Sequence, residues 1–325
     1  MKCPFFFLLL VLAPTMGPAA APPPAAAPAL RLYLLGTGGP ELTPQRLGPS
    51  TVIEVNGQLL LFDVGRGAMQ RMYESRLKIT AITRVFFTHL HSDHIVGLPD
   101  LWITSWFLLG RSGPMEFWGP AGTAQMLEGM KAFFAHDMVN RVHGVDTPAG
   151  LQYQVREFTQ DGVIYERDGV VVTAFAVEHK DGNPAYGYRI EYGGHAVVLS
   201  GDCTLSPNLI AHARGADVIV HNVFAVSDAV MARDPVKRIV ATKLASPAQV
   251  AEVFNQDRPR LAVLSHIIRI DLTDEDVVQR VRAAGYAGPL ELGRDRMVID
   301  IGPEITITPP PALDKLADVA KRGDS

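Results

Sequence analysis

The chain has 325 residues, of which 47% are hydrophobic and 20% charged, so it has enough apolar side chains to form the core of a globular protein. Its formal net charge is −4, and it contains no run of Lys or Arg. Because nucleic-acid-binding proteins usually carry a basic surface, this balance argues against a nucleic-acid partner and favours a small-molecule substrate.

The first 29 residues differ in composition from the rest. Lys2 precedes an apolar run over residues 5–13 that is too short to span a bilayer, and the small residues Ala19-Ala20-Ala21 follow it. This order is typical of a secretory signal peptide with its cleavage site. We therefore expect a signal peptide over residues 1–21 and a Pro/Ala-rich linker over 22–29. An uncleaved anchor and a misassigned start codon are the alternatives.

Removal of the signal peptide would leave a periplasmic or secreted protein with no stable membrane span. The mature chain would keep Cys203 and lose Cys3, so it would contain no internal disulfide. The sequence leaves the oligomeric state open, and a homodimer is compatible with it.

Strands and helices alternate along the chain from residue 30 onward. Asn56-Gly57 and Gly193-Gly194 are hairpin turns, and Ser246 is a suitable N-cap. The predicted strands are 30–35, 51–55, 59–63, 85–88, 115–118, 152–158, 163–166, 170–177, 186–192, 196–200, 217–220 and 261–264. The predicted helices are 66–75, 101–109, 123–137, 207–213, 246–255 and 274–284, and a last hairpin is expected around Arg294-Asp295.

Two strand-rich halves with helices outside them predict an α/β fold, an αββα sandwich of two mixed β-sheets flanked by helices. The domain is expected to cover residues 30–303, followed by a loosely ordered tail over 304–325.

The segment from Thr88 to His94, Thr-His-Leu-His-Ser-Asp-His, is the densest chemical motif of the chain. It places three imidazoles and one carboxylate within six residues, directly after a predicted strand. Imidazole and carboxylate together suit Zn²⁺ and its first-row neighbours. The segment therefore predicts a metal site, and the alternative is a set of core histidines satisfied by backbone groups.

Three further side chains, His179, Asp202 and His266, also follow apolar strands. Open sheets gather their ligands at the carboxyl ends of strands, so these side chains are expected to converge with the first cluster. The combined set has too many ligands for one tetrahedral zinc ion and the right number for two. The expected cofactor is two Zn²⁺ ions, although the ligand types also suit Mn²⁺ or Fe²⁺.

With these motifs the chain resembles the metallo-β-lactamase-fold hydrolase superfamily, and within it the ribonuclease Z and arylsulfatase-like branch. The resemblance covers residues 30–301. Its motifs are Thr88-His89-Leu90-His91-Ser92-Asp93-His94, Glu178-His179, Leu199-Ser200-Gly201-Asp202 and Leu264-Ser265-His266. Supporting segments are Leu35-Gly36-Thr37-Gly38, Leu61-Phe62-Asp63-Val64-Gly65 and Gly187-Tyr188-Arg189.

The resemblance implies a role for each ligand. One metal would be held by His89, His91 and His179, the other by Asp93, His94 and His266, and Asp202 would bridge the two. The expected catalytic residues are Asp93 and Asp202, because two cations convert a shared water to hydroxide and Asp93 is placed to orient it. The residues expected beside the ligands are His221 and Asp63, for which core packing and a turn-forming role are equally compatible.

The chain departs from the ribonuclease Z pattern at two positions. Asn222 stands where those enzymes have Glu, and Leu244 stands where they have His. In those enzymes the Glu and the His are thought to help protonate the leaving group. Leucine cannot transfer a proton, and Lys243 is the nearest ionisable residue. Gly193-Gly194 also leaves no room at that turn for the arm with which long ribonuclease Z enzymes grip tRNA.

We therefore expect an exported, dinuclear zinc hydrolase of a small ester-type substrate, a phosphodiester, sulfate ester or lactone, that uses a metal-bridging hydroxide. The alternatives are a ribonuclease Z-like phosphodiesterase or nuclease, a β-lactamase-like amide hydrolase, and a metal-binding protein that has lost catalysis. Asp202 disfavours the β-lactamase alternative, because those enzymes generally lack a carboxylate that bridges both metals.

Overall fold

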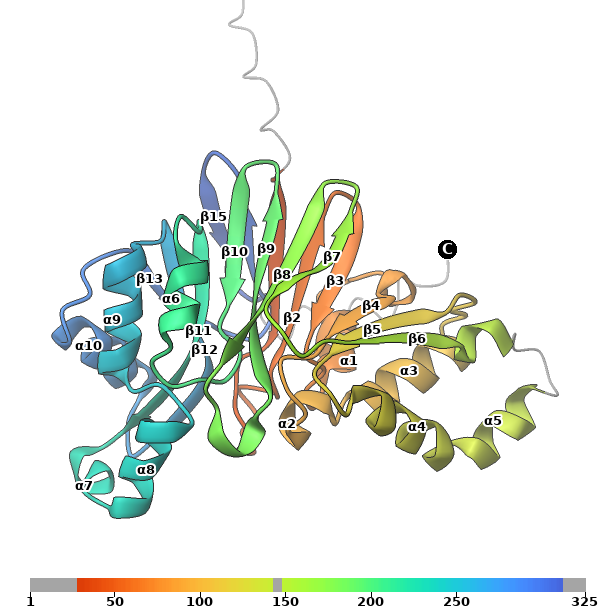
Figure 1. The fold of residues 1–325 in the computed structure, drawn as a ribbon, viewed down its shortest axis with the longest axis horizontal. Helices are drawn as coiled ribbons and strands as arrows, with labels where there is room; N and C mark the ends of the chain where they lie inside the picture. Colours follow the sequence, from red (N-terminus) through yellow and green to blue (C-terminus); the bar gives the residue numbers. More distant parts are fainter. Residues whose placement is uncertain (1–27, 143–147, 312–325) are drawn as a thin grey trace, which may run out of the picture.

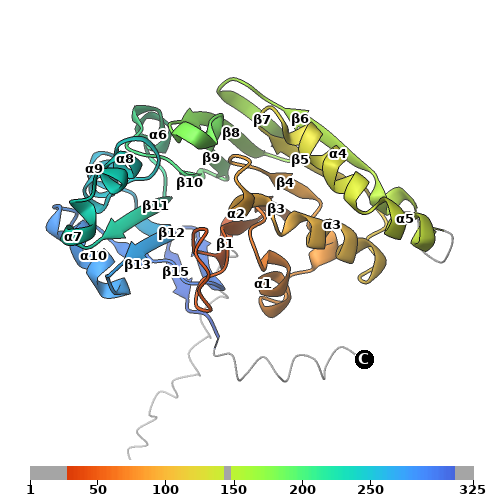
Figure 2. The same ribbon diagram turned by 90° about the horizontal axis from the view of Figure 1, so that it is seen from below.

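The computed structural model describes residues 28–142 and 148–311. Two β-sheets pack face to face, and helices cover their outer faces (Figures 1 and 2). This arrangement confirms the predicted α/β sandwich. The expected signal peptide and most of the expected linker lie outside the described residues. Within the described ranges, no helix is long and apolar enough to cross a membrane.

The first sheet has the strand order β15-β14-β1-β2-β3-β4-β5-β6. Its strands pair antiparallel from β15 to β3 and parallel from β3 to β6. Its strands are β1 (Leu30–Gly36), β2 (Ser50–Val55), β3 (Gln58–Phe62), β4 (Arg84–Phe86), β5 (Met115–Gly119), β6 (Tyr153–Glu157), β14 (Met297–Ile301) and β15 (Ile305–Thr308).

The second sheet has the order β13-β12-β11-β10-β9-β8-β7, with parallel pairs from β13 to β10 and antiparallel pairs from β10 to β7. Its strands are β7 (Gly162–Arg167), β8 (Val170–Val177), β9 (Ala185–Tyr192), β10 (His195–Leu199), β11 (Val218–Val226), β12 (Leu261–Ile270) and β13 (Leu290–Leu292). Both sheets are therefore mixed, as predicted.

The helices fall into two groups along the chain, one outside each sheet (Figure 2). The first group is α1 (Ala68–Glu74), α2 (Ser92–Ile95), α3 (Leu98–Phe107), α4 (Thr123–Phe133) and α5 (Ala135–Val142). The second is α6 (Pro207–Ala213), α7 (Asp228–Met231), α8 (Asp234–Thr242), α9 (Pro247–Asp257) and α10 (Asp274–Ala283). The single-turn helices are η1 (Ile79–Ala81), η2 (Pro148–Leu151) and η3 (Lys180–Gly182).

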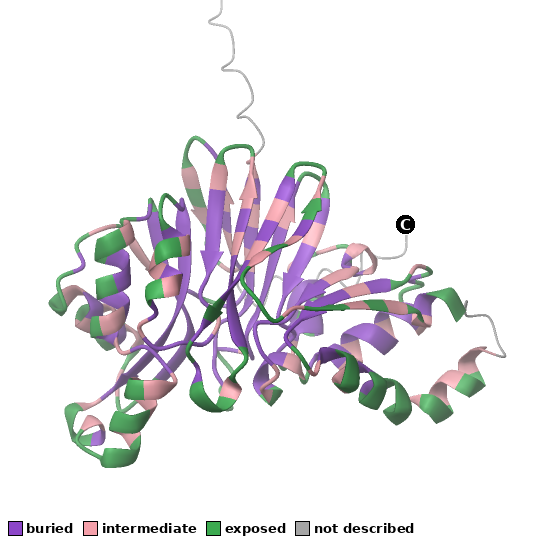
Figure 3. Ribbon diagram, viewed as in Figure 1, coloured by how far each residue is buried: buried purple, intermediate pink, exposed green. Residues whose placement is uncertain are grey.

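The main core lies between the two sheets, where the inward side chains of alternating strand positions are fully buried (Figure 3). Aromatic rings fill its centre: Phe86 stacks on Phe62 and Trp118, with ring centroids 4.9 and 4.7 Å apart. A second apolar cluster lies between the first sheet and its helices, and a third lies between the second sheet and its helices. Because both faces of each sheet are apolar, polar side chains gather at the ends of the strands.

Several predicted boundaries are wrong. Arg294-Asp295 is not a hairpin turn, because β13 and β14 belong to different sheets and the segment crosses between them. The expected loose tail over 304–325 contains strand β15, which is ordered because Ile305 and Ile307 pack against the main core. The predicted helix over 123–137 is two helices that break at Phe134.

Strands β11 and β12 are longer than predicted, and they carry site residues within them rather than after them. The register between the two strands shifts at Asn222, and His266 has a φ of 42°. This bulge turns polar side chains toward one end of the sandwich and lets the buried strand resume at Val223. Helices α7 and α8, which follow β11, were not predicted.

A buried carboxylate, Asp295, fixes the loop that follows β1. It accepts hydrogen bonds from the backbone and hydroxyl of Thr37, both at 2.9 Å, from the Leu47 backbone at 2.8 Å, and from Arg71 Nε at 3.0 Å. Thr37 in turn accepts a backbone hydrogen bond from Ile267, next to His266. Asp295 therefore ties the loop after β1 and helix α1 to the segment between β13 and β14.

Replacing Asp295 with Ala should lower the free energy of unfolding by about 3–5 kcal/mol, because it removes a buried charge partner of Arg71, which keeps only Glu74, and leaves two backbone donors without an acceptor. Urea unfolding measures this loss. The matched control is Asp300→Ala, which breaks a partly exposed pair with Arg31 and should cost about 1 kcal/mol or less. Equal losses for the two variants would contradict the role given to Asp295.

Candidate metal centre

The first sheet supplies four polar side chains from the loop after β4 and from helix α2. Tyr186 donates its backbone N–H to the Thr88 carbonyl, and Thr88 donates both its backbone N–H and its hydroxyl to Asp63, each at 2.8 Å. These bonds fix the chain where it leaves the strand. His89 is completely buried, and His91, the N-cap residue of α2, is half-buried. Asp93 and His94 follow within the single turn of α2.

The second sheet supplies His179, Asp202 and His266, which are 3%, 4% and 6% exposed. His179 follows β8, Asp202 follows β10, and His266 lies at the bulge in β12. Gly201 has a φ of 60°, and a Cβ there would come within 2.6 Å of the Tyr186 carbonyl oxygen, so glycine is needed beside Asp202.

The structure brings the seven predicted side chains together in overlapping groups. In each group, one ligand atom per residue lies within 4.8 Å of the others. The groups are His89, His91 and His179; Asp93, His94 and His266; and His89, His94 and Asp202. The first two groups are the same two sets that the sequence resemblance implies, and the third places Asp202 against both. Their role as metal ligands is a prediction that this geometry supports.

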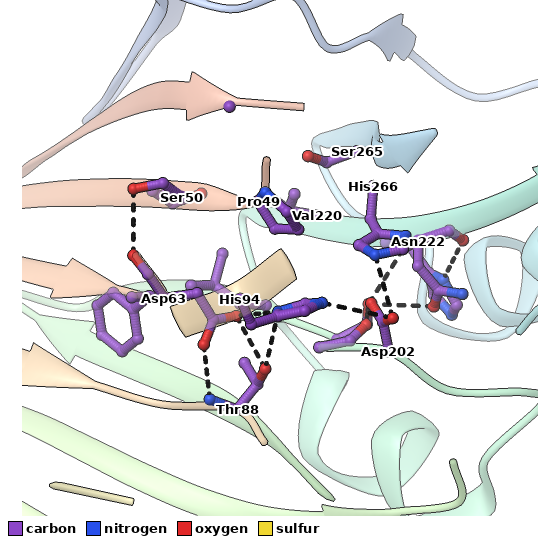
Figure 4. Close-up of a pocket in the computed structure, with 17 residues that line it drawn as sticks. Pro49, Ser50, Asp63, Thr88, His94, Asp202, Val220, Asn222, Ser265 and His266 are labelled. Atoms are coloured by element: carbon purple, nitrogen blue, oxygen red, sulfur yellow. Dashed lines mark hydrogen bonds and ion pairs between the residues drawn. The ribbon is translucent and has the colours of Figure 1, made fainter. Parts of the chain in front are cut away.

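Asp202 lies between the two groups. Its Oδ2 is 3.1 Å from His266 Nε2, 3.5 Å from His94 Nε2 and 3.7 Å from His179 Nε2. Figure 4 shows His94, Asp202 and His266 directed toward one another from different elements. A carboxylate at this position would be shared by any two cations that the two groups held.

Several ligand atoms have no hydrogen-bond partner among the described residues although they are buried. They are His89 Nε2, His94 Nε2 and Asp202 Oδ1. A buried polar atom without a partner costs free energy, so such atoms need an explanation. Imidazole nitrogens and carboxylate oxygens are the donors that Zn²⁺ prefers, and the residues present therefore fit two divalent cations.

Burial and neighbouring charges shift the pKa values of three of the predicted ligands, His89, His94 and Asp202. Burial and the neighbouring His94 hold the pKa of His89 well below its ordinary value, so this ring is neutral. Burial opposes protonation of His94 as well, but Asp202 and Asp63 outweigh it and hold the pKa of His94 well above its ordinary value. Burial would raise the pKa of Asp202, but His266 and His94 hold it well below its ordinary value.

Asp63 lies directly behind one ligand. His94 Nδ1 donates to Asp63 Oδ2 at 2.8 Å, which leaves Nε2 to face the centre (Figure 4). Asp63 also has a φ of 57°, so it occupies a turn as well as holding the ring. His221 is fully buried, donates Nδ1 to the Asn222 carbonyl at 2.8 Å, and lines a cavity of about 50 Å³ with Asp202 and His266.

The structure uses Asn222 and Leu244 for packing and positioning. The Asn222 side chain donates to the Cys203 carbonyl at 3.0 Å and accepts from the Cys203 backbone at 3.3 Å, so it holds the loop that carries Asp202. Leu244 is buried against Phe224 and Ile268. Neither side chain is placed to supply a proton.

One supporting group was missed by the sequence analysis. The Lys243 carbonyl accepts a hydrogen bond from His179 Nδ1 at 2.7 Å, while the Lys243 ammonium pairs with Asp181. A backbone carbonyl leaves no residue-specific signal, so no motif indicates this contact. Lys243 therefore holds the turn around His179 from both its main chain and its side chain.

Comparison with known proteins identifies the family. Residues 59–267 match the protein family described as "Beta-lactamase superfamily domain". The chain is 33% identical over 278 residues to ribonuclease Z of Mycobacterium marinum, covering 84% of this chain and 99% of that protein. The chain belongs to the metallo-β-lactamase superfamily, in its ribonuclease Z branch. It is a metal-dependent hydrolase.

Solved structures agree with this assignment. The short form of human tRNase Z has a TM-score of 0.65 and 25% identity, covering 84% of this chain and 99% of that one. A Zn²⁺-bound protein, PqqB from Methylobacterium extorquens, has a TM-score of 0.60 and 18% identity, covering 83% of this chain and 100% of that one. The second likeness shows the fold alone.

Replacing Asp63 with Asn should weaken metal binding about 10- to 100-fold, because the amide nitrogen would meet the His94 Nδ1–H that the carboxylate now accepts. Metal content after dialysis against a chelator measures the loss. Asp217 offers a matched control, because it holds His195 Nδ1 at 3.2 Å next to the starts of β10 and β11. Asp217→Asn should leave the metal content unchanged, and equal losses would contradict the role of Asp63.

Metal affinity should fall as the pH falls from 8 to 6. The ligand histidines bind metal when neutral, and the pKa of His94 is raised, so a proton competes for this ring already near neutral pH. Each competing proton costs up to about tenfold in affinity per pH unit. Competition titrations against a chelator of known pH dependence measure this, and an affinity that is flat across the range would contradict the assignment.

Proposed function

We propose that this chain hydrolyses phosphodiester bonds with a two-metal centre, and that RNA is its substrate class. The observation that carries the proposal is the position of Asp202, which joins the two groups of ligands. Support for the substrate class comes from the relatives, which are named ribonuclease Z and tRNase Z. The expectation that nucleic acid is not a partner rested on the net charge, the expected signal peptide and the short Gly193-Gly194 turn, and the names of these relatives argue against that exclusion.

Two divalent cations in this centre would polarise a water molecule and neutralise charge that develops on the phosphoryl group. The protein supplies the arrangement around them. Asp93 Oδ2 lies 3.4 Å from His266 Nε2 at the edge of the centre, where its carboxylate is placed to orient the attacking water and take its proton. Asp202 keeps its negative charge between the two ligand groups.

Protonation of the leaving group differs from the ribonuclease Z pattern, because Asn222 and Leu244 replace the expected Glu and His. We infer that the rate depends steeply on how good the leaving group is. This same observation favours a second candidate function, hydrolysis of a small activated ester such as a sulfate ester or lactone. Export is a further proposal, based on the N-terminal sequence pattern.

The test uses the full zinc-loaded chain on bis(p-nitrophenyl) phosphate and on a tRNA precursor with a 3′ extension, with p-nitrophenyl sulfate, nitrocefin and a homoserine lactone as alternatives. We expect hydrolysis of both phosphodiesters, with Asp202→Ala lowering kcat/KM by about 10³-fold or more and reducing the bound metal.

The control for this experiment is Glu304→Gln, an exposed carboxylate far from the centre along the chain, which should leave kcat/KM unchanged. Full activity with full metal content in Asp202→Ala would overturn the two-metal assignment. Hydrolysis of the sulfate ester or lactone alone would establish the second candidate. A wild-type chain that binds two metal ions and hydrolyses none of the substrates would establish a metal-binding protein.

A further inference from the structure

The segment over residues 227–243, which contains α7 and α8, forms a helical hairpin attached to the metal centre. At its C-terminal end the Lys243 carbonyl accepts from His179 Nδ1 at 2.7 Å, and the Val240 carbonyl accepts from the Thr204 hydroxyl at 3.0 Å. Thr204 lies two residues after Asp202. The hairpin projects beyond the ends of β11 and β12, at the end of the sandwich where α2 lies (Figure 1).

One face of α8 packs against the protein. Val236, Ile239 and Val240 lie against a small apolar cluster that contains Leu244. These positions follow the spacing of one helix face, so the intervening residues must point away from the cluster. The apolar face is therefore directed at the protein, although its three side chains are only half-buried, and no large hydrophobic side chain of residues 227–243 is exposed.

The hairpin over residues 227–243 is basic in a chain that is acidic overall. Residues 227–243 carry four Lys and Arg against two Asp, whereas the whole chain has a net charge of −4. Arg233 and Arg238 are exposed, and neither guanidinium has an ion-pair partner within residues 28–142 and 148–311. Lys237 pairs with Asp234, but these side chains are 58% and 80% exposed, so water screens the pair.

We propose that this hairpin is a docking surface for the phosphate backbone of the RNA substrate. Its nine-residue helix α8 is about 14 Å long and ends at a ligand of the metal centre, so the basic side chains lie within roughly four nucleotide steps of the reacting phosphate. Exposed cations without partners bind such a backbone by releasing its counterions. This inference rests on the proposed RNA substrate.

The test is the triple variant R233E/K237E/R238E of the full chain. Binding of a fluorescein-labelled, 3′-extended tRNA precursor is followed by anisotropy in EDTA, which prevents cleavage, between about 50 and 200 mM KCl. Affinity should fall about tenfold or more at the lowest salt, and the slope of log affinity against log salt should become shallower by about 2–3. Hydrolysis of bis(p-nitrophenyl) phosphate by the zinc-loaded variant should remain unchanged.

The matched control is R76E/R214E/R258E, which reverses three exposed cations that lie before the starts of β4, β11 and β12, away from the centre. It should change RNA affinity less than about twofold. Equal RNA binding by wild type and hairpin variant would overturn the docking surface, as would binding of anionic phosphatidylglycerol vesicles in place of RNA. RNA binding that depends on the hairpin, without hydrolysis of any phosphodiester, would support the surface and overturn the proposed function.

Discussion

The candidate metal centre depends on one constraint: side chains from two separate sheets must meet around one buried carboxylate, Asp202. Asp202 comes from the second sheet, yet its Oδ2 lies 3.5 Å from Nε2 of His94, which comes from the first. The inter-sheet core sets this distance, because the two sheets pack on each other through it, and the rings of Phe62, Phe86 and Trp118 stack within it. A change in sheet packing would therefore disturb both groups of predicted ligands together.

The support around the ligands is built mostly from charges and backbone groups held in place by long-range contacts. Asp63 orients His94, the Lys243 carbonyl orients His179, and Asp295 fixes the loop that meets the strand of His266. Asp63 and Asp295 are buried, so water does not compete for their hydrogen bonds, and the Lys243 carbonyl lies at the end of α8. These contacts hold the predicted metal ligands in place. Asn222, which stands where ribonuclease Z enzymes have Glu, instead holds the loop that carries Asp202.

The sandwich could be predicted from the alternation of apolar strands with helices, and the convergence of the seven side chains from the dense motif at Thr88–His94 and from polar residues at the predicted strand ends. Their role as metal ligands stays a prediction. His221 and Asp63 were harder, since a lone His and a turn Asp have several ordinary roles. The crossing at Arg294-Asp295 and the hairpin over residues 227–243 were missed because they are set by contacts between distant segments. The role of the Lys243 carbonyl was invisible because every residue has a carbonyl, and sequence alone does not show which one a histidine will reach.

The most direct measurement of the central claim is anomalous diffraction from crystals of the full chain grown with zinc. The account predicts two zinc peaks, one among His89, His91 and His179 and one among Asp93, His94 and His266, with Asp202 in contact with both. A single peak, or two peaks of which neither contacts Asp202, would contradict it.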